Sequence, residues 1–102
     1  MPEIWISDNS TFPKLEGNIE VTSWKDERIV IAADPQGLKS LAAQLLFLAD
    51  IDQESVPNMP DGERMHTHFF PGYELSGDSI ETEICRLDAK GTGEFPEGYK
   101  PA

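Results

Sequence analysis

The sequence predicts an α+β domain in which a mainly antiparallel sheet of about five strands carries one amphipathic helix on one face, in the order βββαββ. Alternation of apolar and polar residues in short segments, one long stretch of helical periodicity and a strong helix start before it support this prediction. The 102 residues are the length of one domain. We place this domain at residues 1–88 and assign residues 89–102 to a C-terminal tail containing Gly and Pro.

Five segments have the composition of strands. Residues 4–6 form a short apolar run that is closed by a turn-rich cluster. Residues 19–24 alternate and are followed, after a polar turn, by residues 28–33, so these two are expected to form an antiparallel hairpin. The continuous β-branched run inside 28–33 predicts a strand that is covered on both faces or lies near the centre of the sheet. Residues 63–70 and 79–87 complete the set.

The helix is predicted to begin after Asp34, because this side chain can cap free N–H groups and Pro35 suits the first helical position. It is predicted to end near Asp50. One apolar stripe is expected to face the sheet, consisting of Leu38, Leu41, Ala42, Leu45, Leu48 and Ala49.

Alternation also predicts which side chains share a face in the last two strands. In residues 63–70 one face carries Met65, Thr67 and Phe69, and the other carries His66, His68 and Phe70. The face turned away from the helix is then open to solvent or to a partner. The side chains expected there are Glu20, Thr22, Trp24, His66, His68, Phe70, Glu81, Glu83 and Cys85.

The charge of the chain limits its partners. Nineteen acidic and eight basic side chains give a formal net charge of −11, which repels nucleic acid and anionic membranes and attracts basic surfaces. The longest apolar-rich stretch, residues 38–49, is too short to span a bilayer, and the N-terminus lacks the features of a signal peptide. We therefore expect no nucleic-acid or membrane partner. The single cysteine is compatible with a cytoplasmic protein, which is the location we expect.

His66 and His68 are the residues that suggest a metal site. On a strand, an H-x-H pattern directs both imidazoles to one face, and Glu81 or Glu83 could add a third ligand. The pattern alone is also typical of two surface histidines, so we expect no metal and no other cofactor and keep a metal site as an alternative. Cys85 has acidic neighbours that disfavour a reactive thiolate. Phosphate-binding loops and metalloprotease motifs are absent from the sequence, which favours a protein that is not an enzyme.

Three segments resemble a known family. They are GLKSLA at 37–42, MHTH at 65–68, and LSGDS at 75–79 leading into IETEICR at 80–86. Together they are similar to the immunity protein 32 family of bacterial polymorphic toxin systems. The resemblance implies a non-enzymatic cytoplasmic protein that binds a cognate toxin domain and blocks it.

The charge is consistent with this function on independent grounds. Toxin domains that act on nucleic acid, such as nucleases, need basic surface, and an acidic partner can cover it. Two alternatives stay open: a small metal-binding protein or metal-dependent enzyme that uses His66 and His68, and an accessory domain that homodimerises through an open sheet face or edge. The partner-binding residues expected for an immunity protein are the acids Asp61, Glu63, Glu74, Glu81 and Glu83 and the anchors Trp24, Phe70 and Tyr73.

Overall fold

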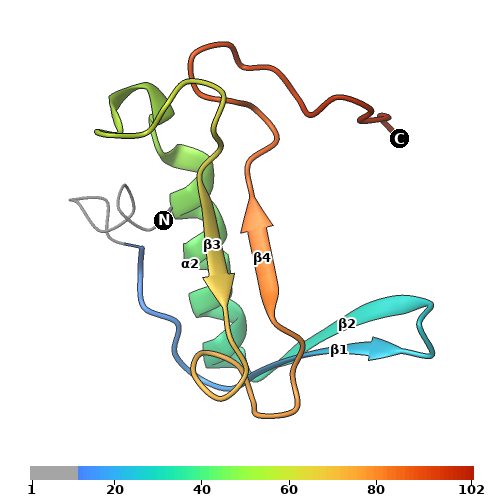
Figure 1. The fold of residues 1–102 in the computed structure, drawn as a ribbon. Coiled ribbons are helices and arrows are strands. Elements are labelled where there is room, and N and C mark those ends of the chain that lie inside the picture. The colour runs from blue at the N-terminus through green and yellow to red at the C-terminus, as the bar shows by residue number, and fades with distance from the viewer. Residues whose placement is uncertain (1–11) are drawn as a thin grey trace.

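The computed structural model describes residues 12–102 and confirms the α+β class, with one helix and short strands in the order ββαββ (Figure 1). The strand predicted at residues 4–6 lies outside the described residues. No helix in the described part of the chain is long and apolar enough to cross a membrane. The elements are β1 (Ile19–Trp24), β2 (Arg28–Ala33), α2 (Pro35–Asp50), the 3-10 turn η1 (Gln53–Ser55), β3 (His66–Phe69) and β4 (Thr82–Cys85).

The prediction of one sheet with about five strands is wrong for residues 12–102, where four strands form two separate two-stranded antiparallel sheets. The predicted hairpin is confirmed as β1–β2, and β3 pairs with β4. The sheets do not merge because an irregular segment occupies the second edge of β1. Ser76 N–H donates to the Ile19 carbonyl at 2.9 Å, and Ile80 N–H donates to the Val21 carbonyl at 2.7 Å.

Both strands of the second sheet are shorter than residues 63–70 and 79–87, the ranges that the alternation predicts. β3 ends because the Phe70 N–H turns away to the Glu74 carboxylate, at 2.8 Å, and begins a tight loop. β4 begins late because Ile80 is hydrogen-bonded to β1 rather than to β3. Hydrogen bonds of Phe70 and Ile80 to groups outside the sheet therefore determine where β3 ends and β4 begins. The alternation of apolar and polar residues does not predict such hydrogen bonds.

The helix start is confirmed at Asp34. Its Oδ1 accepts from Gly37 N–H at 2.8 Å, and Pro35 occupies the first turn. The same carboxylate accepts from the Asn18 side chain at 2.7 Å and from the Asn18 backbone N–H at 3.0 Å, which ties the helix start to the chain before β1. These bonds, with the Asn18 side chain first, hold the pKa of Asp34 below its ordinary value.

The buried face of α2 differs from the predicted stripe. Leu48 is buried as predicted, but Leu38 and Leu45 are 51% and 43% exposed, while Gly37 and Gln44 are buried. The β3–β4 sheet in front of α2 has only two strands (Figure 1). Thr67 of β3 donates to the buried Gln44 side chain, and so narrow a sheet covers only part of the predicted stripe.

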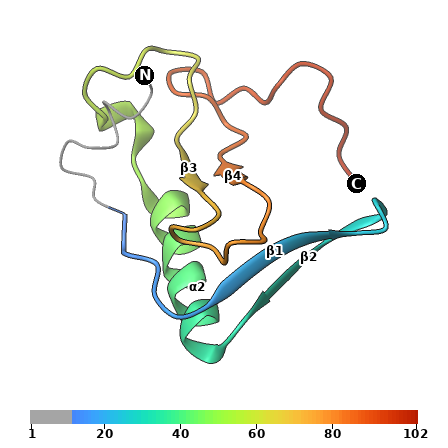
Figure 2. The ribbon, with the colours of Figure 1, turned by 60° about the horizontal axis from the view of Figure 1, so that its bottom comes forward.

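Two apolar clusters make up the core. One joins β1 to the segment after β3, and the other joins the end of α2 to the loop before β3; the partly buried Ile84 packs against both. The β1–β2 hairpin extends beyond this core (Figure 2). Ile29 and Ile31 are 60% and 50% exposed and their strand belongs to a sheet of two strands, so the prediction of a strand that is covered on both faces or central in the sheet is wrong. The buried members are Ile19, Val21, Phe69 and Leu75 in the first cluster and Leu48, Val56, Met59 and Met65 in the second.

Candidate partner-binding surface

The predicted alternation in the last two strands produces one polar face. Met65, Thr67 and Phe69 are buried, whereas His66 and His68 are half-buried on the opposite side of β3. The register pairs His66 with Cys85 and His68 with Glu83. We call these four side chains, His66, His68, Glu83 and Cys85, the β3–β4 outer face.

The polar groups of this face are in close contact. The rings of His66 and His68 have centroids 4.9 Å apart, and the ring of Phe70 meets His68 edge-on at 5.8 Å. His68 Nε2 lies 3.4 Å from Glu83 Oε1. One ligand atom from each of His66, His68 and Glu83 lies within 4.8 Å of the other two, so the residues named by the H-x-H pattern and one of its two candidate acids come together.

Cys85 is exposed, but its surroundings do not activate it. Desolvation raises the pKa of its thiol, and the charge of Glu83 and a hydrogen bond with it raise the pKa further, against the weaker opposing effect of Arg64. The thiol form is therefore favoured, in agreement with the expectation from its acidic neighbours.

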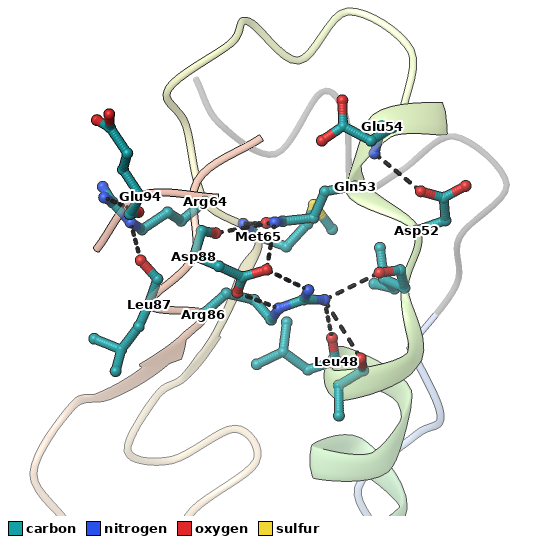
Figure 3. A network of polar contacts seen from close by, with 12 residues as sticks. Leu48, Asp52, Gln53, Glu54, Arg64, Met65, Arg86, Leu87, Asp88 and Glu94 are labelled. Carbon is teal, nitrogen blue, oxygen red and sulfur yellow. Dashed lines mark hydrogen bonds and ion pairs between the residues drawn. The ribbon is translucent and has the colours of Figure 1, made fainter. Parts of the chain in front are cut away.

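Arg86 binds the C-terminal end of α2 rather than facing solvent (Figure 3). Its Nη1 donates to the carbonyls of Leu48 and Ile51 at 2.9 and 3.0 Å, and its Nε and Nη2 form a bidentate pair with Asp88 at 2.8 and 2.7 Å. No basic residue occupies the last turn of α2, so this guanidinium supplies the positive charge that a helix C-terminus favours.

Two further bases are bound in the same way. Arg64 donates to the carbonyls of Leu87 and Glu94 at 2.6 and 2.8 Å, and Lys90 Nζ donates to those of Val56 and Met59. These bonds bring residues 89–94 against the loop before β3, and Ala89 is buried there. The boundary at residue 88 stays a prediction.

Two more basic side chains lie over an aromatic ring in the β1–β2 hairpin. Lys25 Nζ and the Arg28 guanidinium each lie 4.4 Å from the centroid of the Trp24 ring. Five of the eight basic side chains therefore contact groups of the chain itself. From Asp50 to Cys85 the sequence holds nine acids and only one base, Arg64, whose guanidinium is bound to carbonyls.

The predicted acids fall into three groups. Asp61 and Glu63 are exposed in the loop before β3, where the backbone of Gly62 and Glu63 pairs with Lys90. Glu81 is exposed just before β4, and Glu83 is paired with His68. Glu74 differs from the rest because its carboxylate accepts from the Phe70 N–H and so shapes the loop that follows β3.

The predicted aromatic anchors do not lie together. Phe70 and Tyr73 follow β3 directly and are 38% and 85% exposed. Trp24 belongs to the other sheet, near the tip of the hairpin. Sequence reasoning did not predict the exposure of Ile29, Ile31, Leu38 and Leu45, because their helical spacing and β-branched run are also the signals of a buried core.

Fold and surface together define a small, strongly acidic α+β domain with a polar outer face. The family model described as immunity protein 32 matches residues 28–87, more than half of the chain, and the chain belongs to this family. The match covers β2, α2, β3, β4 and Arg86, and thus the whole β3–β4 outer face. No curated protein and no solved structure matches the chain.

Proposed function

We propose that this chain is an immunity protein that acts in the cytoplasm by binding a cognate toxin domain and neutralising it. The observation that carries the proposal is the unbalanced acid around β3 and β4. Asp61, Glu63 and Glu81 are exposed, while Arg64 and Arg86 are bound to carbonyls and, for Arg86, to Asp88 as well. Membership of the immunity protein 32 family supports the same function.

A basic toxin domain is the partner that such a surface favours. A domain that acts on nucleic acid needs Lys and Arg to bind phosphates, and an acidic protein that covers those side chains excludes the substrate. The net charge of −11 would also steer the two proteins together, since opposite fields raise the association rate. Inhibition by this route requires no catalysis by the immunity protein.

Tyr73 is the best-placed anchor for such a complex, with Phe70 beside it. Tyr73 is 85% exposed in the loop after β3, within one residue of Glu74 and three residues beyond Phe70. An aromatic side chain buries a large area at a small cost in rotamer entropy, and so contributes strongly at interfaces. We propose that this loop provides the apolar contact and the surrounding acids provide the charge.

The test is protection of cells that express the toxin encoded beside this gene. The double charge reversal Glu63→Lys with Glu81→Lys should abolish protection and weaken binding to the purified toxin domain at least about tenfold, because two favourable charge contacts become repulsive. The matched control, Glu20→Lys with Glu27→Lys on the hairpin, makes the same change in net charge on the other sheet. It should keep protection and lose less than about threefold in affinity.

Two results would contradict the proposal. If wild-type protein neither binds the toxin nor protects the cells, it is not the cognate immunity protein. If both double variants lose affinity equally, net charge rather than this surface determines binding. A strong concentration-dependent self-association in light scattering would favour the homodimer alternative, for which the exposed Ile29 and Ile31 offer apolar surface.

A further inference from the structure

The β3–β4 outer face contains a set of side chains suited to a metal ion. His66 and His68 come from β3 and Glu83 from β4, so the cluster crosses the two strands. One nitrogen from each imidazole and one carboxylate oxygen lie within 4.8 Å of one another. Two imidazoles and a carboxylate are a ligand set used by zinc, with a fourth position left for water or another ligand.

The tautomer of His66 matches that of a metal ligand. Its Nδ1 lies 3.1 Å from the Arg64 carbonyl oxygen. A carbonyl oxygen only accepts hydrogen bonds, so a neutral His66 ring that makes this bond carries its proton on Nδ1 and has a free lone pair on Nε2. A backbone carbonyl that receives the second ring N–H is the usual partner that orients a metal-binding histidine.

The distance between the His68 and Glu83 ligand atoms is close to the distance between two ligands of a bound ion. Ligands about 2.0 to 2.1 Å from a tetrahedral Zn²⁺ are roughly 3.3 Å apart. His68 Nε2 and Glu83 Oε1 are already 3.4 Å apart, and as direct cross-strand partners they are held in register by the sheet. The His66 nitrogen lies within 4.8 Å of both of these atoms.

The strand that bears both histidines is firmly placed. Met65, Thr67 and Phe69 alternate with them and are buried at 0%, 9% and 2% exposure. Gln53 Oε1 accepts from the Met65 N–H at 2.8 Å, which fixes the backbone at the start of β3. Ligands on a strand fixed by its buried side chains lose little freedom when they bind an ion.

We propose that His66, His68 and Glu83 form a site for one divalent transition-metal ion of the Zn²⁺ class. The ion joins β3 to β4 across the β3–β4 outer face, and its remaining coordination position is directed to solvent. The negative field of the chain adds to the attraction for the cation. Cys85 lies on the same face but outside the cluster, so the site uses nitrogen and oxygen ligands.

Calorimetric titration of the full chain, without a histidine tag, with ZnCl₂ tests this site. We expect one ion per chain, and His68→Ala should weaken binding at least about tenfold, because it removes one of three protein ligands. Glu81→Gln is the matched control, since it removes a neighbouring acid outside the cluster and should leave the affinity unchanged. Absence of binding, or several weak sites with the same affinity in wild type and His68→Ala, would overturn the proposal.

A second measurement does not depend on any variant. Co²⁺ added to the wild-type protein should give the visible absorption of a four-coordinate ion with nitrogen and oxygen ligands, and Zn²⁺ should displace it. A spectrum identical to that of aqueous Co²⁺ would contradict the site. Zn²⁺ should also raise the Tm of the wild type and not that of His68→Ala, because an ion that binds only the folded state stabilises it.

Discussion

The two ends of α2 are held by different means. At the C-terminal end, Arg86 donates to the carbonyls of Leu48 and Ile51, and Arg64 is bound to the carbonyls of Leu87 and Glu94 nearby (Figure 3). Lys90 donates to the Val56 and Met59 carbonyls in the loop that follows. At the N-terminal end, the backbone of Gly37 closely approaches that of Gly17 and Asn18 just before β1, and beyond them the β1–β2 hairpin projects from the core (Figure 2). Charged hydrogen bonds therefore hold the C-terminal end of α2 to later segments. The N-terminal end of α2 is instead packed tightly against the base of the hairpin, whose tip is exposed.

This difference explains how a chain with few bases can fold and still expose many of its acids. Each of Arg64, Arg86 and Lys90 donates to two or more backbone carbonyls, at the end of α2 or in a loop. The positive charges of these three side chains are therefore bound to groups of the domain itself. Among the acids near β3 and β4, Asp61, Glu63 and Glu81 stay exposed.

Removal of Arg86 should have the largest effect. Arg86→Met keeps an apolar side chain of similar reach but leaves the carbonyls of Leu48 and Ile51 and the carboxylate of Asp88 without their donor. We expect the free energy of unfolding to fall by about 2 to 3 kcal/mol. Urea denaturation of the variant and of the wild type measures this change.

Arg28→Met on the hairpin is the matched control. It loses only a contact with the exposed Trp24 ring and should cost less than about 1 kcal/mol. Equal losses for the two variants would refute the contrast between the two ends of α2.

Gly37→Ala should come next in size, although alanine is the better helix former. A Cβ at this position would lie 2.6 Å from the Asn18 carbonyl oxygen and 2.9 Å from Ile19 Cγ1. The overpacking should destabilise the protein by about 1 to 3 kcal/mol, measured by thermal unfolding. Gly77→Ala meets nothing within 4 Å and should change stability by less than about 0.5 kcal/mol. An unchanged Tm for Gly37→Ala would show that the hairpin base is not tightly packed.

The acid dependence of stability tests the Arg86–Asp88 pair separately. A hydrogen bond with Arg86 holds the pKa of the Asp88 carboxyl below its ordinary value of 3.8. The unfolded state therefore binds the proton more readily, so the contribution of Asp88 is complete above the ordinary pKa and is lost as the pH falls through the lowered one. The stability difference between wild type and Asp88→Asn should shrink below about pH 4. A difference that stays constant down to about pH 2 would contradict this linkage.

Apart from the control substitutions, the smallest effect is expected near the tip of the hairpin. Ile29 is 60% exposed, and Ile29→Ser should lower the free energy of unfolding by less than about 1 kcal/mol in denaturation experiments. Its cross-strand partner Ser23 is also exposed, so little packing is lost. A loss above about 2 kcal/mol would mean that this side chain is part of the core.

The elements that depend on neighbouring residues were predictable from the sequence. Asp34 and Pro35 define the start of α2 because a capping carboxylate and a fixed φ act within one turn. Alternation correctly separated His66 and His68 from the buried Met65 and Thr67, because successive side chains of a strand point to opposite faces.

The features that depend on distant segments were not predictable. Nothing in residues 76–80 indicates that they bind β1 and so keep the two sheets apart. The exposure of Leu38 and Leu45 follows from the width of the sheet that covers α2, which periodicity does not encode. In the candidate surface, the hydrogen bonds of Arg86 to the end of α2 likewise arise from contacts between segments far apart in the sequence.

The central claim is that exposed acid around β3 and β4 steers this protein onto a basic toxin domain. The most direct test is the association rate constant with the purified toxin, measured by stopped flow at several salt concentrations. We predict a rate that falls at least about tenfold as the ionic strength rises from about 0.01 to 0.5 M, with a shallower salt dependence for Glu63→Lys with Glu81→Lys. A rate that is independent of salt, and equal in the wild type and this variant, would contradict the claim.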